Sequence, residues 1–261
     1  MRMEAEDTAR VAALYVYPIK GLSPQPLTHV PLRRGEGVPH DRRFAFARPE
    51  GKYRPGLREG LRKAEFYALV SDHRLAGLAT HLDVDTGEFT VRVAGHAVLT
   101  AHVEEDREEL LAFFARVLDL PEGVLPVLAA EEGRRFTDVA FAGDGPMHWI
   151  SLVNLASVRD FAARTEAEVD PRRFRANVLL DGLPPFAEVD LLDREFTLGG
   201  VRMVGRYRTG RCAATEVDPA SGRRDLPVLR LLDRTYGHQD VGIYAEVLSD
   251  GVLHVGGGLV V

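Results

Sequence analysis

The chain has 261 residues and a formal net charge of −6, with 33 basic and 39 acidic residues. Nucleic-acid binding needs a net basic face, so this balance argues against a general nucleic-acid partner. The hydrophobic share of 45% and the charged share of 28% are typical of a globular protein, and the apolar runs are too short for a membrane span. One cysteine cannot form an internal disulfide, and the acidic N-terminus lacks an apolar signal segment, so we expect a cytoplasmic protein.

Alternating polar and apolar residues predict strands in the first half of the chain. The predicted strands cover residues 11–17, 27–32, 43–47, 89–94 and 97–103. Pro18 stops the first of them, and Gly95-His96 joins the last two as a hairpin with glycine at the first turn position. The spacing of Leu110 and Phe114 predicts a helix over 107–118.

The stretch 120–135 combines Gly, Pro and Glu, and it predicts a boundary between two β-rich domains, residues 1–125 and 126–261. Strands of the second domain are predicted at 149–153, 195–198, 201–205, 241–248, 252–255 and 258–261, with the last three as a β-meander. Helices are predicted at 154–164 and 226–236, the second ending at Gly237. This pattern predicts a mainly β fold with barrel-like sheets and a few packing helices.

Cys212 is the only cysteine, and it follows three nearby arginines, Arg206, Arg208 and Arg211. Guanidinium groups favour thiolate over thiol, and a thiolate is a nucleophile or a ligand for a soft metal. The residue type alone leaves open a third interpretation, a buried small hydrophobic side chain. It also leaves open a nucleophile–base pair with His238, because catalytic pairs meet in space rather than in sequence.

Two basic segments are candidates for binding an anion. Arg173, Arg175 and Asn177 share one face if their segment is extended, and guanidinium groups suit phosphate. Asp41-Arg42-Arg43 and Lys20 each lie at a strand end in a Gly- or Pro-bounded loop, where ligand residues gather on β scaffolds. The alternatives, a charged strand edge and a surface salt bridge, stay open from these residues alone.

Taken in order, these segments resemble the MOSC family together with its N-terminal β-barrel companion domain. Tyr17-Pro18-Ile19-Lys20-Gly21 is similar to the opening Tyr-Pro-Val-Lys motif of the family, and Asp41-Arg42 to the Asp-Arg pair that follows it. The later motifs are matched, in chain order, by residues 136–138, 150–158, 173–177, 186–188, 211–212 and 217–222. The resemblance spans about residues 11–261 and implies a β-barrel MOSC core.

The resemblance also implies a site for the molybdenum cofactor, molybdopterin. Its cysteine motif makes Cys212 the molybdenum ligand and the catalytic residue. Lys20 and Arg42 are implied to contact the pterin phosphate. The other implied cofactor contacts are Asp138, Ser157, Arg175, Asn177 and Arg211. At the level of the family, pyridoxal phosphate binding is implied as well.

Three functions follow as hypotheses. The first is an oxidoreductase that reduces small N-hydroxylated substrates at a molybdenum held by Cys212. The sequence has no ferredoxin-like cysteine cluster, so the electrons would come from a separate donor protein. The second is a persulfide sulfur carrier, in which Cys212 accepts sulfur from a cysteine desulfurase and delivers it to a metal–sulfur centre. The third is a non-catalytic module that binds an anion or a partner.

Overall fold

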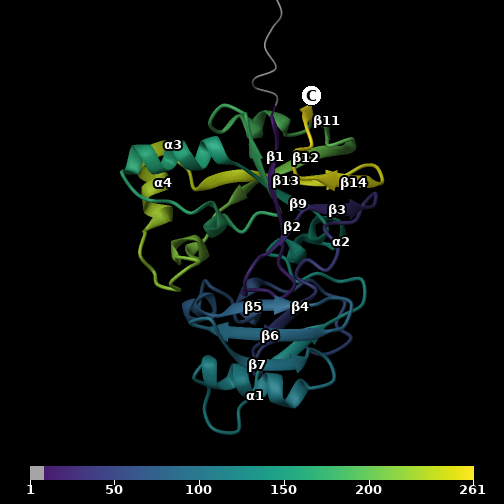
Figure 1. The fold of residues 1–261 in the computed structure, drawn as a ribbon, viewed down its shortest axis with the longest axis vertical. Coiled ribbons are helices and arrows are strands. Elements are labelled where there is room, and N and C mark those ends of the chain that lie inside the picture. The colour runs from purple at the N-terminus through teal and green to yellow at the C-terminus, as the bar shows by residue number, and fades with distance from the viewer. Residues whose placement is uncertain (1–8) are drawn as a thin grey trace, which may run out of the picture.

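The computed structural model describes residues 9–261, which form two β-rich lobes (Figure 1). Most of the barrel lobe comes from residues 9–32 and 150–261, and most of the small lobe from residues 44–130, although Ile19, Leu22 and Val217 pack into the core of the small lobe. The two long connections between the lobes are residues 33–43 and 131–149. A backbone hydrogen bond from the N–H of Phe136 to the carbonyl of Arg42 (2.8 Å) joins these two connections.

An eight-stranded sheet forms the framework of the barrel lobe, in the strand order β15, β11, β12, β13, β9, β10, β1, β2. Its strands are β1 (Arg10–Val16), β2 (Gln25–Leu27), β9 (Ile150–Asn154), β10 (Val178–Asp181), β11 (Glu195–Leu198), β12 (Val201–Gly210), β13 (Asp240–Val247) and β15 (Leu259–Val260). Backbone hydrogen bonds from Leu259 to Ala9 (2.6 Å) and from Val11 to Gly257 (2.9 Å) connect β1 with the far edge of the sheet. The sheet therefore curls back on itself.

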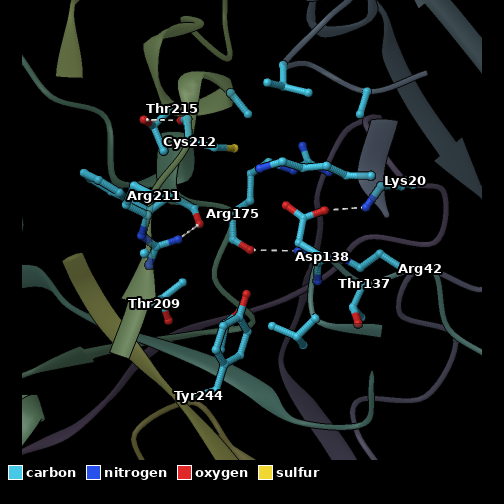
Figure 2. Close-up of a pocket in the computed structure, with 18 of the residues that line it drawn as sticks. Lys20, Arg42, Thr137, Asp138, Arg175, Thr209, Arg211, Cys212, Thr215 and Tyr244 are labelled. Atoms are coloured by element: carbon cyan, nitrogen blue, oxygen red, sulfur yellow. Dashed lines mark hydrogen bonds and ion pairs between the residues drawn. The ribbon is translucent and has the colours of Figure 1, made fainter. Parts of the chain in front are cut away.

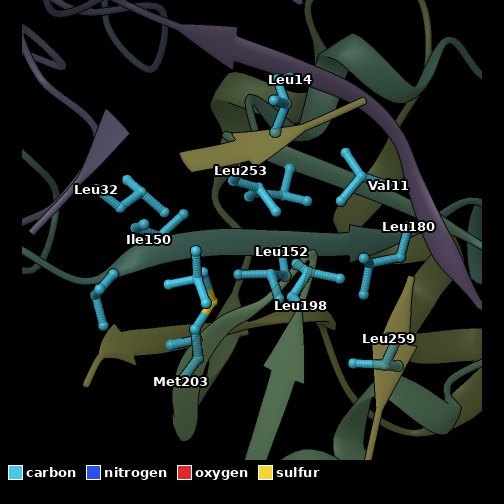
Figure 3. Packing of buried hydrophobic residues seen from close by; sticks show 14 of the residues in the cluster. Val11, Leu14, Leu32, Ile150, Leu152, Leu180, Leu198, Met203, Leu253 and Leu259 are labelled. Carbon is cyan, nitrogen blue, oxygen red and sulfur yellow. The ribbon is translucent and has the colours of Figure 1, made fainter. Parts of the chain in front are cut away.

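Apolar side chains fill the inside of this curled sheet (Figure 3). Successive side chains of a strand point to opposite faces, so every second residue of a strand such as β12 can reach the inside. The buried side chains include Val11, Leu14, Ile150, Leu152, Leu180, Leu198, Met203, Leu253 and Leu259. Burying each one contributes about 1.5–3 kcal/mol. This core makes the barrel lobe a rigid support for the residues at its strand ends.

Two helices cover the barrel lobe on one side, α3 (Leu155–Thr165) and α4 (Val228–Tyr236) (Figure 1). Asn154 caps α3 by accepting a hydrogen bond from the N–H of Ala156 (3.1 Å), and α3 connects the parallel strands β9 and β10. Helix α4 ends at Gly237, whose φ of 73° is readily adopted by glycine. A second buried cluster lies under these helices and includes Phe161, Phe174, Val228 and Leu232.

The small lobe pairs β4 (Phe44–Ala47) with β8 (Val127–Ala130), and it orders β5 (Ala79–Leu82), β6 (Glu88–Val93) and β7 (His96–His102) in a second sheet. Helix α1 (Arg107–Val117) packs Leu110 and Phe114 into a cluster with both sheets. Six short 3-10 helices occur in the connecting segments of the described residues: η1 (Lys63–Glu65), η2 (His73–Gly77), η3 (Ala140–Ala142), η4 (Pro171–Phe174), η5 (Ala187–Leu191) and η6 (Ala213–Glu216). Between the lobes lies the four-residue helix α2 (Asp144–Met147).

The prediction of a mainly β fold with barrel-like sheets and few helices is confirmed. Two local predictions were wrong. The β6–β7 turn consists of Ala94 and Gly95, both with positive φ, so glycine takes the second turn position and His96 begins β7. The last three strands form no meander, because β13 pairs with β9 and β12, whereas β14 (Gly251–His254) pairs with β3 (His29–Leu32) and β15 with β11.

The predicted division at residues 125 and 126 stays a prediction. In space, β1 pairs with β10, and β4 pairs with β8, so each pair joins strands from opposite sides of the predicted boundary. Among the helices of residues 9–261, none is long and apolar enough to cross a membrane.

Candidate functional site

A cavity of about 630 Å³ lies where the two lobes meet. Its volume is in the range of small-molecule sites, which is roughly 300–1,000 Å³. Cys212, Arg211 and Thr209 lie on one side of it, and Lys20, Arg42 and Asp138 on the other (Figure 2). Although the whole chain is acidic, the described lining contains seven basic residues and two acidic ones. The wall is therefore suited to an anion.

Cys212 stands just beyond the end of β12, where the chain turns into η6. Its carbonyl accepts hydrogen bonds from the backbone N–H (3.0 Å) and the hydroxyl (2.9 Å) of Thr215. These two bonds fix the backbone that carries the thiol. The cysteine is free and only partly buried, and it lines the cavity.

Arg211 is held by backbone carbonyls rather than turned toward a ligand. Its guanidinium donates to the carbonyl of Phe174 (2.8 Å) and, from Nε, to that of Val241 (2.8 Å), and it lies 5.3 Å from the Phe174 ring centroid. Burial lowers the pKa of Arg211 to about 10, so the group stays charged at neutral pH. These bonds fasten the residue next to Cys212, in the segment between β12 and η6, to the carbonyls of Phe174 and Val241.

The segment 173–177 is not extended, so the condition under which Arg173, Arg175 and Asn177 would share one face of a strand is not met. Pro171 opens η4, and Arg175 follows it with a φ of 51°, a left-handed conformation that breaks the period-two alternation. Arg173, Arg175 and Asn177 all line the cavity nevertheless. The side-chain oxygen of Asn177 accepts from the N–H (3.2 Å) and hydroxyl (3.0 Å) of Ser151, so Asn177 fastens this turn to β9.

The guanidinium groups of Arg42 and Arg175 both lie against the ring of Tyr17, at 4.3 Å and 4.4 Å from its centroid. Arg42 donates to the carboxylate of Asp41 (2.5 Å) and to the carbonyl of Arg175 (2.9 Å). Arg175 has no carboxylate partner among residues 9–261. Burial lowers the pKa of Arg175 to about 10, which still leaves it charged at neutral pH. Arg175 is thus a cation with no carboxylate within ion-pair distance among the described residues.

On the facing wall, the ammonium of Lys20 pairs with the carboxylate of Asp138 and donates to the carbonyl of Phe136 (2.9 Å). Burial opposes ionisation of Asp138, but the charge and hydrogen bond of Lys20 outweigh it and lower the pKa of Asp138 to about 2. Asp138 is ionised at neutral pH, and it neutralises the lysine that the resemblance assigns to a phosphate.

Three buried side-chain atoms have no hydrogen-bond partner among residues 9–261: Nε of Arg173, Nη2 of Arg175 and Oγ1 of Thr209. All three residues line this cavity. A buried polar group without a hydrogen-bond partner costs about 1–3 kcal/mol, so native proteins rarely leave such a group unpaired. Their concentration in one cavity leaves three hydrogen-bonding positions open to a polar ligand or to water.

Two family models match the chain, one described as the MOSC N-terminal beta barrel domain over residues 8–117 and one as the MOSC domain over residues 140–260. The chain belongs to the MOSC family. No curated protein matches it. Of the solved structures, the YuaD protein from Bacillus subtilis covers 97% of this chain and 94% of its own at 13% identity and a TM-score of 0.44. The match to YiiM from Geobacillus stearothermophilus covers 42% of this chain and 52% of YiiM, at 22% identity and a TM-score of 0.34.

MOSC domains are generally associated with molybdenum cofactor binding, and the cavity fits such a group. A basic wall suits its phosphate, the three unpartnered polar atoms suit its polar ring system, and a free thiol suits its metal. Within residues 9–261 no three His, Cys, Asp or Glu side chains gather as a metal site.

Two residues considered from the sequence lie away from this MOSC cavity. Ser157 is fully buried in α3, where its hydroxyl contacts both carboxylate oxygens of Glu188 (2.9 and 3.0 Å) and accepts from the N–H of Phe186 (2.8 Å). Its bonds are thus used inside the fold, and we do not retain it as a cofactor contact. His238 lines a different, smaller cavity of about 190 Å³, beside Phe186 and Asp190.

Three residues of the MOSC cavity were not singled out from the sequence. Thr209 lies in the same Thr-Gly-Arg-Cys segment as the cysteine, so its neighbourhood was a usable signal. Tyr244 lies on β13 and Trp149 directly before β9, far from the cysteine motif in sequence. Only strand pairing brings them to the cavity, and no local pattern reveals it.

Proposed function

We propose that this chain binds the molybdenum cofactor in the cavity between its lobes, with Cys212 as the protein ligand, and reduces small N-hydroxylated compounds. The observation that carries the proposal is the coincidence of the only thiol with three unpartnered buried polar atoms in one basic cavity. A polar anionic ligand would satisfy those atoms, and a soft thiolate would bind its metal.

Each wall has a separate task in this proposal. Arg175, which has no carboxylate within ion-pair distance, is the main cation for the cofactor's phosphate, whereas Arg42 and Lys20 are paired with Asp41 and Asp138 and would contribute hydrogen bonds rather than net charge. Thr209 and Arg173 supply further hydrogen bonds. When bound, the cofactor would supply two-electron redox chemistry at molybdenum.

The proposed reaction breaks the N–O bond of the substrate. It consumes two electrons and two protons, and the oxygen leaves as water. A separate one-electron carrier protein would supply the electrons. Burial raises the pKa of Tyr244 to about 12, so its hydroxyl keeps its proton at neutral pH and can donate a hydrogen bond to an oxygen atom in the cavity.

The test is the metal and pterin content of chain purified from a host that makes the cofactor. We expect about one molybdenum and one pterin per chain, measured by plasma mass spectrometry and by fluorescence of the oxidised pterin. Cys212→Ser preserves size but removes the soft ligand, so molybdenum should be lost while the circular dichroism spectrum stays the same. Metal-free wild-type chain from such a host would contradict the proposal.

A sulfur-carrier function is the alternative, and the partial exposure of Cys212 favours it because a partner could reach the thiol. The basic wall and its unpartnered atoms have no task in that function, and for this reason we rank it second. Incubation with a cysteine desulfurase and labelled cysteine tests it. Label on the wild-type chain that is absent from Cys212→Ala would support a carrier, and an unlabelled wild-type chain would exclude it.

Pyridoxal phosphate is the other group that the family resemblance implies. Enzymes hold it through a Schiff base to a lysine amine. The buried lysine of this cavity, Lys20, is paired with Asp138. We therefore do not propose a pyridoxal phosphate site.

A further inference from the structure

Large aromatic side chains are exposed where the cavity opens. Tyr207 is 64% exposed and Phe141 is 57% exposed, and both line the cavity. Trp149, also in the lining, stacks with Tyr207 at 5.6 Å between ring centroids and 23° between planes. Contiguous exposed apolar surface of this kind usually marks a binding site. Packing of the fold does not account for it.

The backbone turns Tyr207 outward by a local irregularity of the sheet. Between Gly205 and Tyr207 the register of β12 against β13 shifts, and three consecutive residues, 206–208, face solvent. Such bulges re-aim side chains and are enriched next to active sites. Beside the tyrosine, Arg206 pairs with Glu246 on β13 (2.6 Å), which ties the bulge to its neighbouring strand.

The aromatic pair is connected to the proposed reaction centre by a rigid strand. Tyr207 precedes Cys212 by five residues, and β12 carries the chain nearly all the way between them. Trp149 directly precedes β9, whose residues are fully buried. Both rings are thus held on the barrel lobe at a fixed position relative to the thiol, as a specificity element requires.

We propose that Trp149 and Tyr207 form a stacking platform that selects planar aromatic substrates. The ring of the substrate lies against the platform at the mouth, and its N-hydroxylated group extends into the cavity toward Cys212. This proposal rests on the proposed function for the reacting group, whereas the platform itself is a property of the mouth. A ring–ring contact strengthens binding by about two- to tenfold beyond buried area.

The position of Trp149 provides a direct measurement, because it is the only tryptophan of the chain. Two probes share one N-hydroxyamidine group and differ in the ring: benzamidoxime carries a phenyl group and acetamidoxime a methyl group. Titration followed by tryptophan fluorescence, with calorimetry as a second measurement, gives the affinity of each. We expect benzamidoxime to change the fluorescence and to bind at least about fivefold tighter than acetamidoxime.

Two variants test the tyrosine. Tyr207→Ala should reduce the preference for benzamidoxime several-fold and leave acetamidoxime affinity unchanged, whereas Tyr207→Phe should keep the preference. Because Tyr207 is exposed, neither substitution removes a side chain from the core, and we expect both variants to fold. Circular dichroism checks this. Equal affinity of the wild-type chain for the two probes, or an unchanged preference in Tyr207→Ala, would overturn the platform.

Binding and chemistry are measured apart, on metal-loaded and metal-free chain. A ring preference seen in both forms supports the platform whatever the metal content. Turnover of both probes with equal KM by loaded chain would overturn the platform and leave the proposed reduction intact. Conversely, metal-loaded chain that binds benzamidoxime preferentially but reduces neither probe would overturn the proposed reduction and support the platform.

Discussion

The guanidinium carbon of Arg175 lies 4.4 Å from the centroid of the Tyr17 ring. The contact joins the turn after η4 to the loop after β1, two segments 158 residues apart in sequence. A charged planar group stacked on a ring keeps its edge free for a ligand. We expect this arrangement of a cation that can bind an anion through its free Nη2.

Replacing Arg175 with lysine tests this assignment. Lysine keeps the charge but loses the planar group, its stacking and its fork of donors. Loss of a charge-assisted hydrogen bond costs about 1.5–3 kcal/mol, so cofactor affinity should fall about ten- to a hundredfold. Molybdenum per chain after purification measures the effect. Arg230→Lys, on the exposed face of α4, is the matched control and should retain its metal. Full molybdenum content in Arg175→Lys would remove the residue from the site.

The Lys20–Asp138 pair predicts an acid-dependent change in stability. The folded pKa of Asp138, about 2, lies below its usual value of 3.8, so the stabilisation is present above 3.8 and is lost as the pH falls through about 2. Because the Asp138 side chain is 47% exposed, solvent screens the pair, and we expect Asp138→Asn to cost about 1 kcal/mol or less at neutral pH. Urea unfolding at several pH values measures this. A difference between variant and wild type that persists to the lowest pH would contradict the pairing.

Ser157→Ala separates a structural role from a cofactor role. The substitution removes the hydroxyl that contacts Glu188 and leaves a buried carboxylate with fewer partners, at a cost of about 1–3 kcal/mol. Molybdenum content should not change, because Ser157 does not line the cavity. Ser221→Ala, at an exposed position, controls for the loss of a hydroxyl. A variant of normal stability that has lost its metal would restore Ser157 to the site.

Glu188 gives the opposite pH dependence from Asp138. Burial raises its pKa above 4.5, so its contribution to stability is fully present below that pH and is lost as the pH rises through the folded value. Glu188→Gln cannot ionise. Its melting temperature relative to wild type should therefore rise between pH 4.5 and neutral pH. A difference in melting temperature that stays constant over that range would contradict a raised pKa of Glu188 in the folded protein.

The sequence was most informative where a motif is local. Cys212 with Arg208 and Arg211, Lys20 after the first strand and the Arg175 segment could all be found from neighbouring residues, and all of them line one cavity, whereas Arg206 does not. It was least informative where contacts join distant segments. The bond between Ser157 and Glu188 spans 31 residues, and the pairing of β14 with β3 spans more than 200, so neither leaves a local pattern. The η4 turn is intermediate, since Asp170-Pro171 is a helix-start signal in the sequence, whereas the left-handed conformation of Arg175 after the turn leaves no such signal.

The central claim is that the sulfur of Cys212 binds molybdenum. X-ray absorption at the molybdenum edge tests it most directly, because it counts the sulfur atoms around the metal. Wild-type chain is compared with Cys212→Ser chain that has been reloaded with cofactor and freed of unbound metal. We predict one sulfur ligand fewer in the variant than in the wild type. The same number of sulfur ligands in both would show that the thiol of Cys212 is not a ligand.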